Sequence, residues 1–443
     1  SFQTALTESY NMKPTLLALA LLLPLSVQAA TDIQRWRNRD GTQILLVERH
    51  ENPIIDLEVS FKGAGSVANP DGKSQVAEFT AALLTDGTQE LDEEAFNAEA
   101  DNIGAQISSD SNTESASAGF RSLSKADIRD KAANLLNHSL TRPRFDEAVF
   151  RRRQTQSITG LQQQETTPDY TATRELTKLI YPNHPYGSGA NITVDSLKRV
   201  NLDDIRAFHR THYGKDNAIV AIVGDLNRKQ AEQLVERVLK DLPAKVTATH
   251  AIPPVPKQTA QRRDIPFAGT QAQVLLGTSL IKRHDPDYYA LVAGNYILGG
   301  GGFDSRLMKV LRDQHGYTYG VYSSLAPATE EGTFAVSYST QKKNTKASLA
   351  DTQAVIEQFI AEGPTEAELK QAKANIVGSF PLRYDSNDKL LNYLSLIGLY
   401  DLPNDYLEAY PKAINSLTVE QVRDAWQRRV KFKDLNTVVV GAE

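Results

Sequence analysis

Two stretches of this chain repeat one pattern 217 residues apart, and this repeat limits the folds that the chain can adopt. Residues 200–206 (VNLDDIR) and 417–423 (LTVEQVR) each open a helix with an acidic first turn and an apolar stripe. Each leads to a β-branched run that ends in glycine, at 219–224 (IVAIVG) and 437–441 (TVVVG). A period near 200 residues indicates duplicated domains rather than a stack of short repeats.

The same offset relates the beginnings of the two repeats, where residues 55–59 (IDLEV) correspond to 272–276 (AQVLL). A chance match between two generic helix–strand units is the alternative, and a constant offset at both ends disfavours it. Residues 248–263 contain three prolines and no periodic pattern, which is typical of an extended linker. The sequence therefore predicts one domain over 31–247 and a second over 264–443.

The local pattern within the first half mixes strands and helices. A hairpin turn is expected at 38–41 (NRDG) and a buried helix at 73–84. Further strands are expected at 54–61, 105–111 and 115–120, and further helices at 124–140, 144–163 and 169–180. Because strands and helices do not alternate strictly, we expect each half to be α+β with a largely antiparallel sheet.

The N-terminal region has the pattern of a secretory signal peptide. Met12-Lys13 precedes an apolar run over 16–25, and small residues stand at Val27 and Ala29 before the expected cleavage site. A membrane anchor is the alternative, but the run is too short to span a bilayer. We expect a signal peptide over 12–29, a mature chain that begins near Ala30, and export to the periplasm or beyond. No later stretch is long and apolar enough to cross a membrane.

Composition excludes several classes of function. The chain has 49 Lys and Arg against 54 Asp and Glu, and this net charge of −5 argues against nucleic acid as a main partner. It has no cysteine, which excludes disulfides, cysteine-ligated zinc and a thiol nucleophile. With 40% hydrophobic and 23% charged residues, it has the composition of a soluble globular protein.

Several short motifs together resemble one enzyme family. The first half contains 65–66 (GS), 83–88 (LLTDGT), 181–187 (YPNHPYG) and 223–225 (VGD). The second contains 298–307 (LGGGGFDSRL) and 311–319 (LRDQHGYTY), which are the most specific. Over residues 31–443 the chain resembles the M16 zinc peptidases (pitrilysin or mitochondrial-processing-peptidase-like). The resemblance implies two homologous M16-type domains, each a mostly antiparallel sheet packed with helices.

The zinc-binding positions of that family are empty in this chain. Active members carry H-x-x-E-H on the first helix, where two histidines bind zinc and the glutamate activates water, and a distal glutamate completes the ligands. Aligned on 87–88 (GT), the three helix positions fall on Glu78, Ala81 and Ala82, and the distal glutamate falls near Gly160, counted back from Pro168. None carries the required group. The chain thus resembles the subunit type that lacks the motif, and no metal is expected in it.

A zinc site elsewhere has little support in the sequence. His209 and His212 are the one close pair among the eight histidines, and no third ligand stands at a suitable spacing. We expect this pair to face solvent or the helix end. A shifted alignment does not restore the family site, because no histidine lies between His50 and His138.

The second half keeps a pair that the family uses for substrate. The resemblance implies that Arg312 and Tyr319, expected on a helix end and on the following strand, reach an active site formed by another M16 domain. A tyrosine hydroxyl can donate to the oxyanion of a tetrahedral intermediate, and an arginine can hold substrate oxygens. The alternative is structural: Arg312 would cap its helix and Tyr319 would fill a strand face.

The glycines at Gly299, Gly300, Gly301 and Gly302 are the other retained feature. By resemblance to the inactive subunit of mitochondrial processing enzymes, they are candidate substrate contacts, although this run is shorter. The alternative is a tight turn between a helix over 288–298 and the next helix. The run is not a nucleotide-binding loop, since no Lys-Ser/Thr follows it.

A polar strand over 108–117 corresponds to the edge strand with which substrates of active members can pair. Its many Ser and Asp residues favour a solvated edge that resists aggregation.

Three hypotheses follow from these features. The first is a non-catalytic, substrate-positioning subunit of a periplasmic heterodimeric M16 peptidase, with zinc in an H-x-x-E-H partner that cleaves peptides. The second is a peptide-binding or scaffold protein without a proteolytic role. The third, an independently active zinc peptidase, conflicts with the missing ligands. The peptide substrate and the stoichiometry of the complex are not encoded in a recognisable motif.

Overall fold

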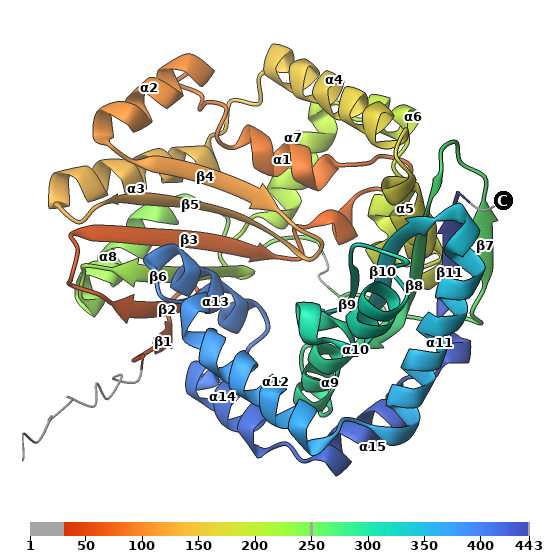
Figure 1. Ribbon diagram of the computed structural model, residues 1–443. Coiled ribbons are helices and arrows are strands. Elements are labelled where there is room, and N and C mark those ends of the chain that lie inside the picture. Colours follow the sequence, from red (N-terminus) through yellow and green to blue (C-terminus); the bar gives the residue numbers. More distant parts are fainter. Residues whose placement is uncertain (1–30, 249–250, 442–443) are drawn as a thin grey trace, which may run out of the picture. The chain divides into compact units, whose positions relative to one another are not determined.

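Two β-sheets of shared topology organise the chain (Figure 1). The computed structural model describes residues 31–248 and 251–441, and the expected signal peptide over 12–29 lies outside them. Residues Asp32–Glu443 form one compact unit. Among the described residues, none of the helices combines the length and the apolar character that a membrane span needs.

The first sheet has the strand order β1-β2-β6-β3-β5-β4. Its neighbours pair antiparallel except β2 and β6, which are parallel. The turn between β1 and β2 is the expected one, with Gly41 at φ +82°. The strands are β1 (Gln34–Arg37), β2 (Gln43–Glu48), β3 (Ile54–Lys62), β4 (Gln106–Ser111), β5 (Ser115–Leu123) and β6 (Ala218–Gly224).

The second sheet repeats this plan in the order β7-β11-β8-β10-β9, with only β7 and β11 parallel. Ile54 opens β3 and Gln271 opens β8, 217 residues later, and the same offset relates the first residues of β5 and β10. The strands are β7 (Arg262–Ile265), β8 (Gln271–Ile281), β9 (Val321–Ala326), β10 (Gly332–Gln341) and β11 (Asn436–Val440). The expected α+β fold of two homologous domains is confirmed.

Local sequence signals determine where the helices begin. Asn201 and Thr418, again 217 residues apart, each complete a capping box at the start of α7 and α15. Thr167 caps α5 ahead of a proline at the first helical position. The helices of the first half are α1 (Val76–Leu83), α2 (Glu93–Ile103), α3 (Ala126–Thr141), α4 (Glu147–Gln164), α5 (Pro168–Ile180), α6 (Val194–Lys198), α7 (Leu202–His212) and α8 (Arg228–Val238).

The helices of the second half are less regular near the glycine run. There α9 continues into a π-helical turn, η3, and a second π-helical turn, η5, follows α10. These elements are α9 (Tyr288–Asn295), η3 (Tyr296–Gly300), α10 (Arg306–Met308), η5 (Lys309–Gln314), α11 (Thr345–Glu362), α12 (Glu366–Ser379), α13 (Asn387–Leu399), α14 (Tyr406–Ser416) and α15 (Val419–Arg429).

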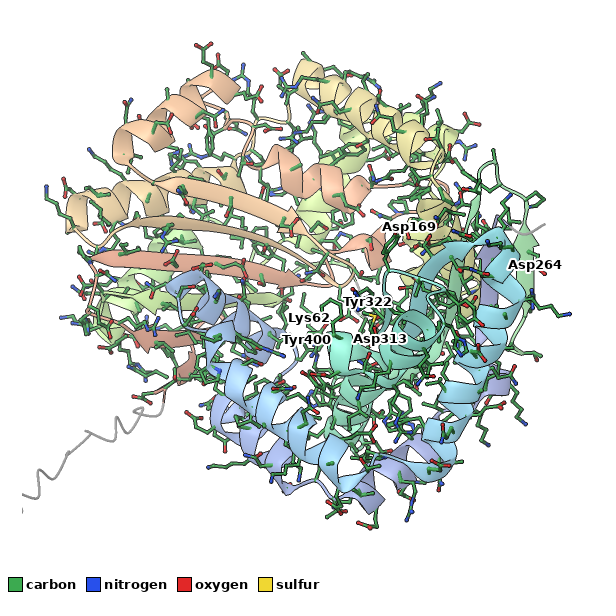
Figure 2. All side chains as sticks on the ribbon, in the orientation of Figure 1. Lys62, Asp169, Asp264, Asp313, Tyr322 and Tyr400 are labelled. Atoms are coloured by element: carbon green, nitrogen blue, oxygen red, sulfur yellow. The ribbon has the colours of Figure 1, made fainter. Side chains whose placement is uncertain are left out.

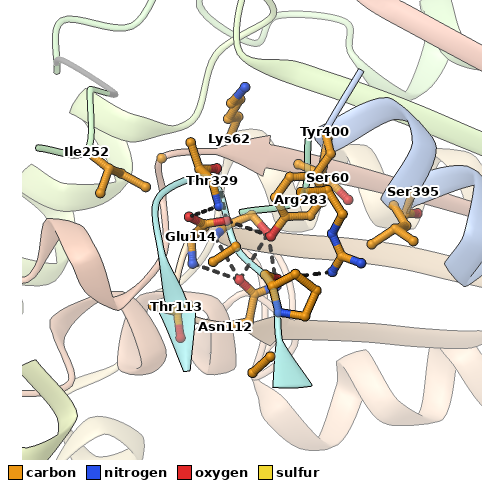
Figure 3. A pocket seen from close by; sticks show the side chains of 18 of the residues that line it. Ser60, Lys62, Asn112, Thr113, Glu114, Ile252, Arg283, Thr329, Ser395 and Tyr400 are labelled. Atoms are coloured by element: carbon orange, nitrogen blue, oxygen red, sulfur yellow. Dashed lines mark hydrogen bonds between the residues drawn. The ribbon is translucent and has the colours of Figure 1, made fainter. Parts of the chain in front are cut away.

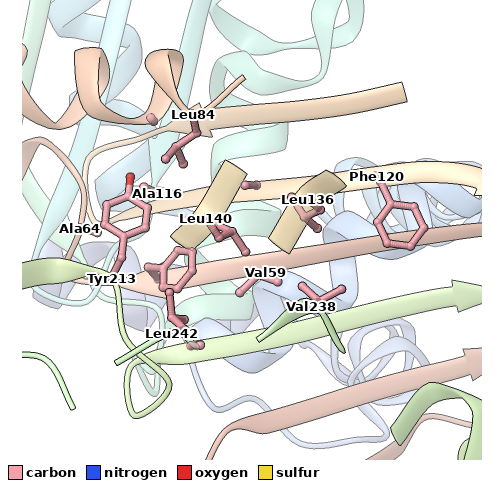
Figure 4. Close-up of a cluster of buried hydrophobic side chains, with 14 of the residues drawn as sticks. Val59, Ala64, Leu84, Ala116, Phe120, Leu136, Leu140, Tyr213, Val238 and Leu242 are labelled. Carbon is pink, nitrogen blue, oxygen red and sulfur yellow. The ribbon is translucent and has the colours of Figure 1, made fainter. Parts of the chain in front are cut away.

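The first sheet buries one face against the helices of its own half (Figure 4). Val59 and Phe120 on the strands meet Leu136 and Leu140 of α3 in this core. Since side chains alternate along a strand, Leu45 and the neighbouring alternate residues of β2 and β6 point to the opposite face and join a second core. The apolar runs of these strands are therefore buried on both sides.

Each half contributes one helix that packs on the sheet of the other half, an arrangement that we call the helix exchange. α5 of the first half packs on the second sheet, where Leu176 and Ile180 approach Gly277 of β8. α13 of the second half packs on the first sheet, where Gly398 lies so close to Ile219 that an added Cβ would sit 2.4 Å from its Cγ2. This reciprocal packing joins the halves through their cores.

Some expected boundaries were wrong. The helix expected over 73–84 begins at Val76, because Gln75 adopts a left-handed conformation with φ 65°. The helix expected over 288–298 is regular only to Asn295, where the π-helical turn takes over. Tyr319 was expected on a strand, but β9 begins two residues later at Val321.

Candidate functional site

Helix α1 holds three of the four positions at which zinc-binding M16 members carry their motif. Glu78 is largely buried, and its Oε2 accepts a hydrogen bond of 3.1 Å from Asn69 Nδ2. Burial raises the pKa of the Glu78 carboxyl, and the Asn69 hydrogen bond opposes this only in part. Glu78 therefore has a structural partner that holds it at the start of α1.

The other positions supply no metal ligand. Ala81 is 1% exposed, and its backbone oxygen accepts a 2.7 Å hydrogen bond from Ser109 Oγ on β4. Ala82 is partly buried in the same helix. Gly160 lies within α4 beside open space, since an added Cβ would meet no heavy atom within 4 Å. The described residues contain no group of three or more His, Asp or Glu side chains placed to hold a metal ion.

Of the two histidines near the end of α7, His209 was placed wrongly from sequence. His209 points inward, with Nε2 2.8 Å from the backbone oxygen of Leu140 and its ring edge-on to Phe145. Burial lowers the pKa of His209, which favours the neutral imidazole. His212 Nδ1 lies 3.1 Å from the backbone oxygen of Phe208 and faces the helix end as expected. The two histidines have separate structural partners.

Arg312 lies in the π-helical turn η5 with its side chain 40% exposed. Its guanidinium stands over the ring of Phe303 at 4.8 Å, and its Nη1 donates to Asp313 Oδ1 at 3.2 Å. Phe303 is itself 66% exposed, so the ring lies at the surface rather than in a core. The stack orients the guanidinium while leaving its remaining N–H groups open to a ligand.

Tyr319 is 96% exposed, although large aromatic side chains are usually at least half buried. It stands in the loop between η5 and β9, which Thr318 shapes by accepting from Gly320 N at 3.2 Å. No hydrogen bond of the Tyr319 hydroxyl is found among the described residues. Asp313 and Tyr322, which flank this loop in the chain, are labelled in Figure 2. Arg312 and Tyr319 thus lie on consecutive exposed segments, η5 and the loop that follows it, and no bond joins them among the described residues.

The four glycines are packed more closely than an open loop would be. An added Cβ at Gly299 would lie 2.6 Å from Ser323 Oγ, and one at Gly301 would lie 2.7 Å from Tyr296. Gly300 closes the π-helical turn, and Gly302 has φ +67°. Close packing and one left-handed residue therefore explain the glycines without a ligand, and their contact with substrate stays a prediction.

A cavity of about 550 Å³ lies where the two halves meet; we call it the junction cavity (Figure 3). Its walls come from the face of β3 and β5, the β4–β5 turn, the β9–β10 turn and α13. The conspicuous motif 181–187 contributes Tyr181 and Tyr186. Burial raises the pKa of Tyr181 to about 12, so its hydroxyl stays protonated and can donate.

Glu114, in the β4–β5 turn, is the hydrogen-bonding centre of this cavity (Figure 3). It accepts from the hydroxyls of Tyr186 at 2.5 Å and Tyr400 at 2.6 Å. It also accepts from Thr329, both from the backbone N–H and from Oγ1, at 3.1 Å each. Burial, reinforced by the carboxylate, raises the pKa of both tyrosines. One side chain thereby joins segments of both halves.

Two family models match the sequence. Residues 44–192 match the model for insulinase (peptidase family M16), and residues 199–376 match the model for the peptidase M16 inactive domain. Together these matches cover well over half of the chain. The chain belongs to the M16 peptidase family.

Proteins with similar sequences and structures extend over nearly the whole of this M16 chain. The non-peptidase homolog YmxG of Helicobacter pylori is 26% identical over 432 residues, covering 97% of this chain and 98% of that protein. The crystal structure of a peptidase M16 inactive domain from Pseudomonas fluorescens has a TM-score of 0.88 and 33% identity, covering 93% of this chain and 98% of that chain.

A third similarity concerns the fold alone. The periplasmic protease PqqL from Escherichia coli has a TM-score of 0.80 at 17% identity, and the match covers 94% of this chain but 46% of that chain. This M16 family member therefore has the architecture of proteases as well as of a non-peptidase, and the side chains on α1 separate it from the zinc-binding type.

Sequence reasoning missed Glu114, Arg283 and Tyr400 as cavity residues of this M16 chain. Glu114 stood in a segment interpreted as a solvated edge, and β4 is indeed an edge strand. Tyr400 lies 286 residues further along the chain, and no local pattern connects the two. The motif 181–187 was the one signal in the sequence that pointed to this region.

Proposed function

We propose that this chain is the non-catalytic, substrate-positioning subunit of an exported two-subunit M16 zinc peptidase. The observation that carries the proposal is an asymmetry between the halves. α1 offers Ala81, Ala82 and an internally bonded Glu78 where zinc ligands and a general base would stand. The second half presents Arg312 and a 96% exposed Tyr319. The partner subunit would carry H-x-x-E-H, and its zinc would supply the activated water for peptide hydrolysis.

The roles of the two presented residues follow from their chemistry. The Tyr319 hydroxyl has no intramolecular partner among the described residues and would donate to the oxyanion that forms on the scissile carbonyl. The Arg312 guanidinium, held over Phe303, would bind carbonyl or carboxylate oxygens of the peptide. The glycines over 299–302 would border the same peptide. The signal pattern over 12–29 supports a location in the periplasm or another exported compartment.

The test is co-expression with an M16 homologue that carries H-x-x-E-H, followed by a peptide cleavage assay on the purified complex. Tyr319→Phe and Arg312→Ala are expected to lower kcat/KM by about 100-fold, the usual effect of losing an oxyanion donor. Tyr170→Phe and Arg228→Ala, which change the same residue types in the first half, serve as controls. Unchanged kcat/KM for both site variants in a verified complex would refute the proposed roles.

A second candidate function is peptide binding or scaffolding without proteolysis. It is supported by the similarity to the Helicobacter relative, a non-peptidase homolog, and by the junction cavity. The two functions differ in one readout. A complex that cleaves peptides only when this chain is present supports the subunit, whereas peptide binding with no effect on any M16 partner supports the scaffold.

A further inference from the structure

The face of the first sheet on which α13 packs also forms the floor of the junction cavity. Ser60 of β3 stands opposite Ser117 of β5, which stands opposite Asp110 of β4. Lys62 stands opposite Ser115 one step further along the same strands. The Ser60 hydroxyl donates to Glu58 Oε1 at 3.3 Å, and the Ser115 hydroxyl is bonded to Asn112. The floor therefore presents Ser117, Asp110 and Lys62 to the cavity.

Two cations in the cavity lack carboxylate partners. Arg283 Nη2 donates to the Pro327 backbone oxygen at 3.2 Å, and its guanidinium lies 4.8 Å over the Tyr400 ring. Its Nε is buried and has no hydrogen-bond partner. Among residues 31–248 and 251–441, neither Arg283 nor Lys62 forms an ion pair. Elsewhere in the chain, partly buried arginines such as Arg306 bind carboxylates.

Two of the nearby carboxylates, Glu114 and Glu58, accept hydrogen bonds from neutral donors. Glu114 receives its hydrogen bonds from Tyr186, Tyr400 and Thr329. Glu58 accepts from Ser395 Oγ at 2.6 Å. Since a partly buried guanidinium with an unsatisfied N–H costs free energy, its retention inside a cavity points to an anionic ligand.

We propose that the junction cavity binds the carboxylate of a short peptide. Arg283 donates to that carboxylate, and Lys62 adds a second positive charge at the floor. A volume of about 550 Å³ is within the range of small-molecule sites and accommodates a few residues. The Ser117 hydroxyl offers a hydrogen bond to a peptide group, and Asp110 at the edge strand provides an acceptor for an amino group. This site does not depend on a catalytic partner.

The carboxylate can be a peptide C-terminus or an acidic side chain, and one titration series separates them. The probes are trialanine, trialanine amide and N-acetyl-Ala-Glu-Ala amide, each titrated calorimetrically into the purified chain without any partner subunit. We expect trialanine to bind and trialanine amide to bind at least about 10-fold more weakly, because the amide loses a charge-assisted hydrogen bond. Binding of the Glu peptide alone would assign the site to side-chain carboxylates.

Two substitutions connect this binding to the cavity. Arg283→Gln is expected to weaken binding of the preferred peptide about 10-fold or more, and Lys62→Gln to weaken it several-fold. Lys62 is exposed and unpaired, so its variant keeps the fold even if Arg283→Gln does not. Arg228→Gln is the matched control, since Arg228 also stacks on an aromatic ring, Trp36, but outside the cavity.

Three outcomes would overturn the proposal: no binding of any probe at millimolar concentration, equal affinity for trialanine and its amide without binding of the Glu peptide, or unchanged affinity in both cavity variants. All of these are measured on the isolated chain. Failure of the cleavage assay with a zinc-bearing partner would therefore leave this site untouched, and the reverse also holds.

Discussion

The Glu114 carboxylate and the Tyr400 hydroxyl are joined by a hydrogen bond of 2.6 Å that connects the two halves of the chain. Hydrogen bonds to a charged group contribute about 1.5–3 kcal/mol each, less where solvent reaches them. Glu114→Gln keeps the shape but removes the charge and two acceptor sites. We expect this variant to lower the free energy of unfolding by about 1–3 kcal/mol, measured by urea denaturation.

The control for this change is Glu94→Gln on α2. This glutamate is exposed, and its substitution should leave the free energy of unfolding within about 0.5 kcal/mol of wild type. A double-mutant cycle between Glu114→Gln and Tyr400→Phe should show a coupling energy of at least about 0.5 kcal/mol. Additive effects of the two substitutions would mean that the bond contributes nothing to holding the halves together.

Gly398 provides a test of the helix exchange. An added Cβ would lie 2.4 Å from Ile219 Cγ2, so Gly398→Ala should force α13 away from the first sheet. Overpacking of this kind costs about 1–3 kcal/mol. Gly378→Ala is the matched control: Gly378 is also the second-to-last residue of its helix, α12, and has nothing within 4 Å of an added Cβ. There alanine should stabilise by up to about 1 kcal/mol. Equal melting temperatures for both variants would contradict the exchange.

The pKa of Glu368 indicates how the stability of the region that carries Arg312 depends on acid pH. Burial alone would raise the pKa of Glu368, but hydrogen bonds from Arg306 and from the Thr365 N–H outweigh it and lower the pKa to about 2. Arg306 begins the segment that leads through η5 to Arg312, so this pair fixes the start of that segment.

A lowered pKa means that the stabilisation is present above the unfolded value of 4.5 and is lost as the pH falls towards 2. Since the Glu368 side chain is 24% exposed, we expect about 2 kcal/mol after screening. The stability difference between wild type and Glu368→Gln should therefore shrink between pH 4.5 and 2. The exposed Glu366→Gln is the control, and a difference that is independent of pH would contradict the assignment.

Phe303 is expected to act through Arg312. Its ring stacks on the guanidinium at 4.8 Å, and an exposed cation–π contact contributes about 0.5–1 kcal/mol. If Arg312 binds substrate in an active complex, Phe303→Leu should lower kcat/KM about 2- to 5-fold, while Phe303→Tyr, which keeps an aromatic ring, should retain activity. A leucine variant as active as wild type would show that the stack has no positioning role.

Most of the fold could be predicted from the sequence, because the duplicated halves share one offset. The capped helices at Asn201 and Thr418 and the strands that follow them were predictable from propensity and spacing. The exchange of α5 and α13 was not, because the apolar runs of β6 and β11 indicate burial on both faces without indicating which helix covers each face.

The candidate site also has features that could be predicted from the sequence and features that could not. The empty zinc positions could be seen in the sequence, since they rest on residue identity at a fixed spacing. The exposure of Tyr319 could not, because a β-propensity pattern made it part of the next strand. Glu114 and Arg283 acquire their environment from segments far away in the chain. Glu114 is bonded to Tyr400 of the other half, and Arg283 donates to Pro327, 44 residues further along its own half.

Zinc content tests the assignment of α1 directly. The purified chain is expected to retain far less than one zinc per molecule after dialysis, because alanine offers no lone pair and a single Glu78 cannot fix a metal ion that takes four ligands. Glu78→His with Ala82→His should add two ligands one helical turn apart and give weak, chelator-reversible binding, since the distal ligand is still missing at Gly160. The measurement is metal analysis by mass spectrometry, with the single variant Ala82→His as the control. Stoichiometric zinc in the unmodified chain, together with chelator-sensitive cleavage, would require a ligand set that α1 does not contain, and would make this chain a peptidase in its own right.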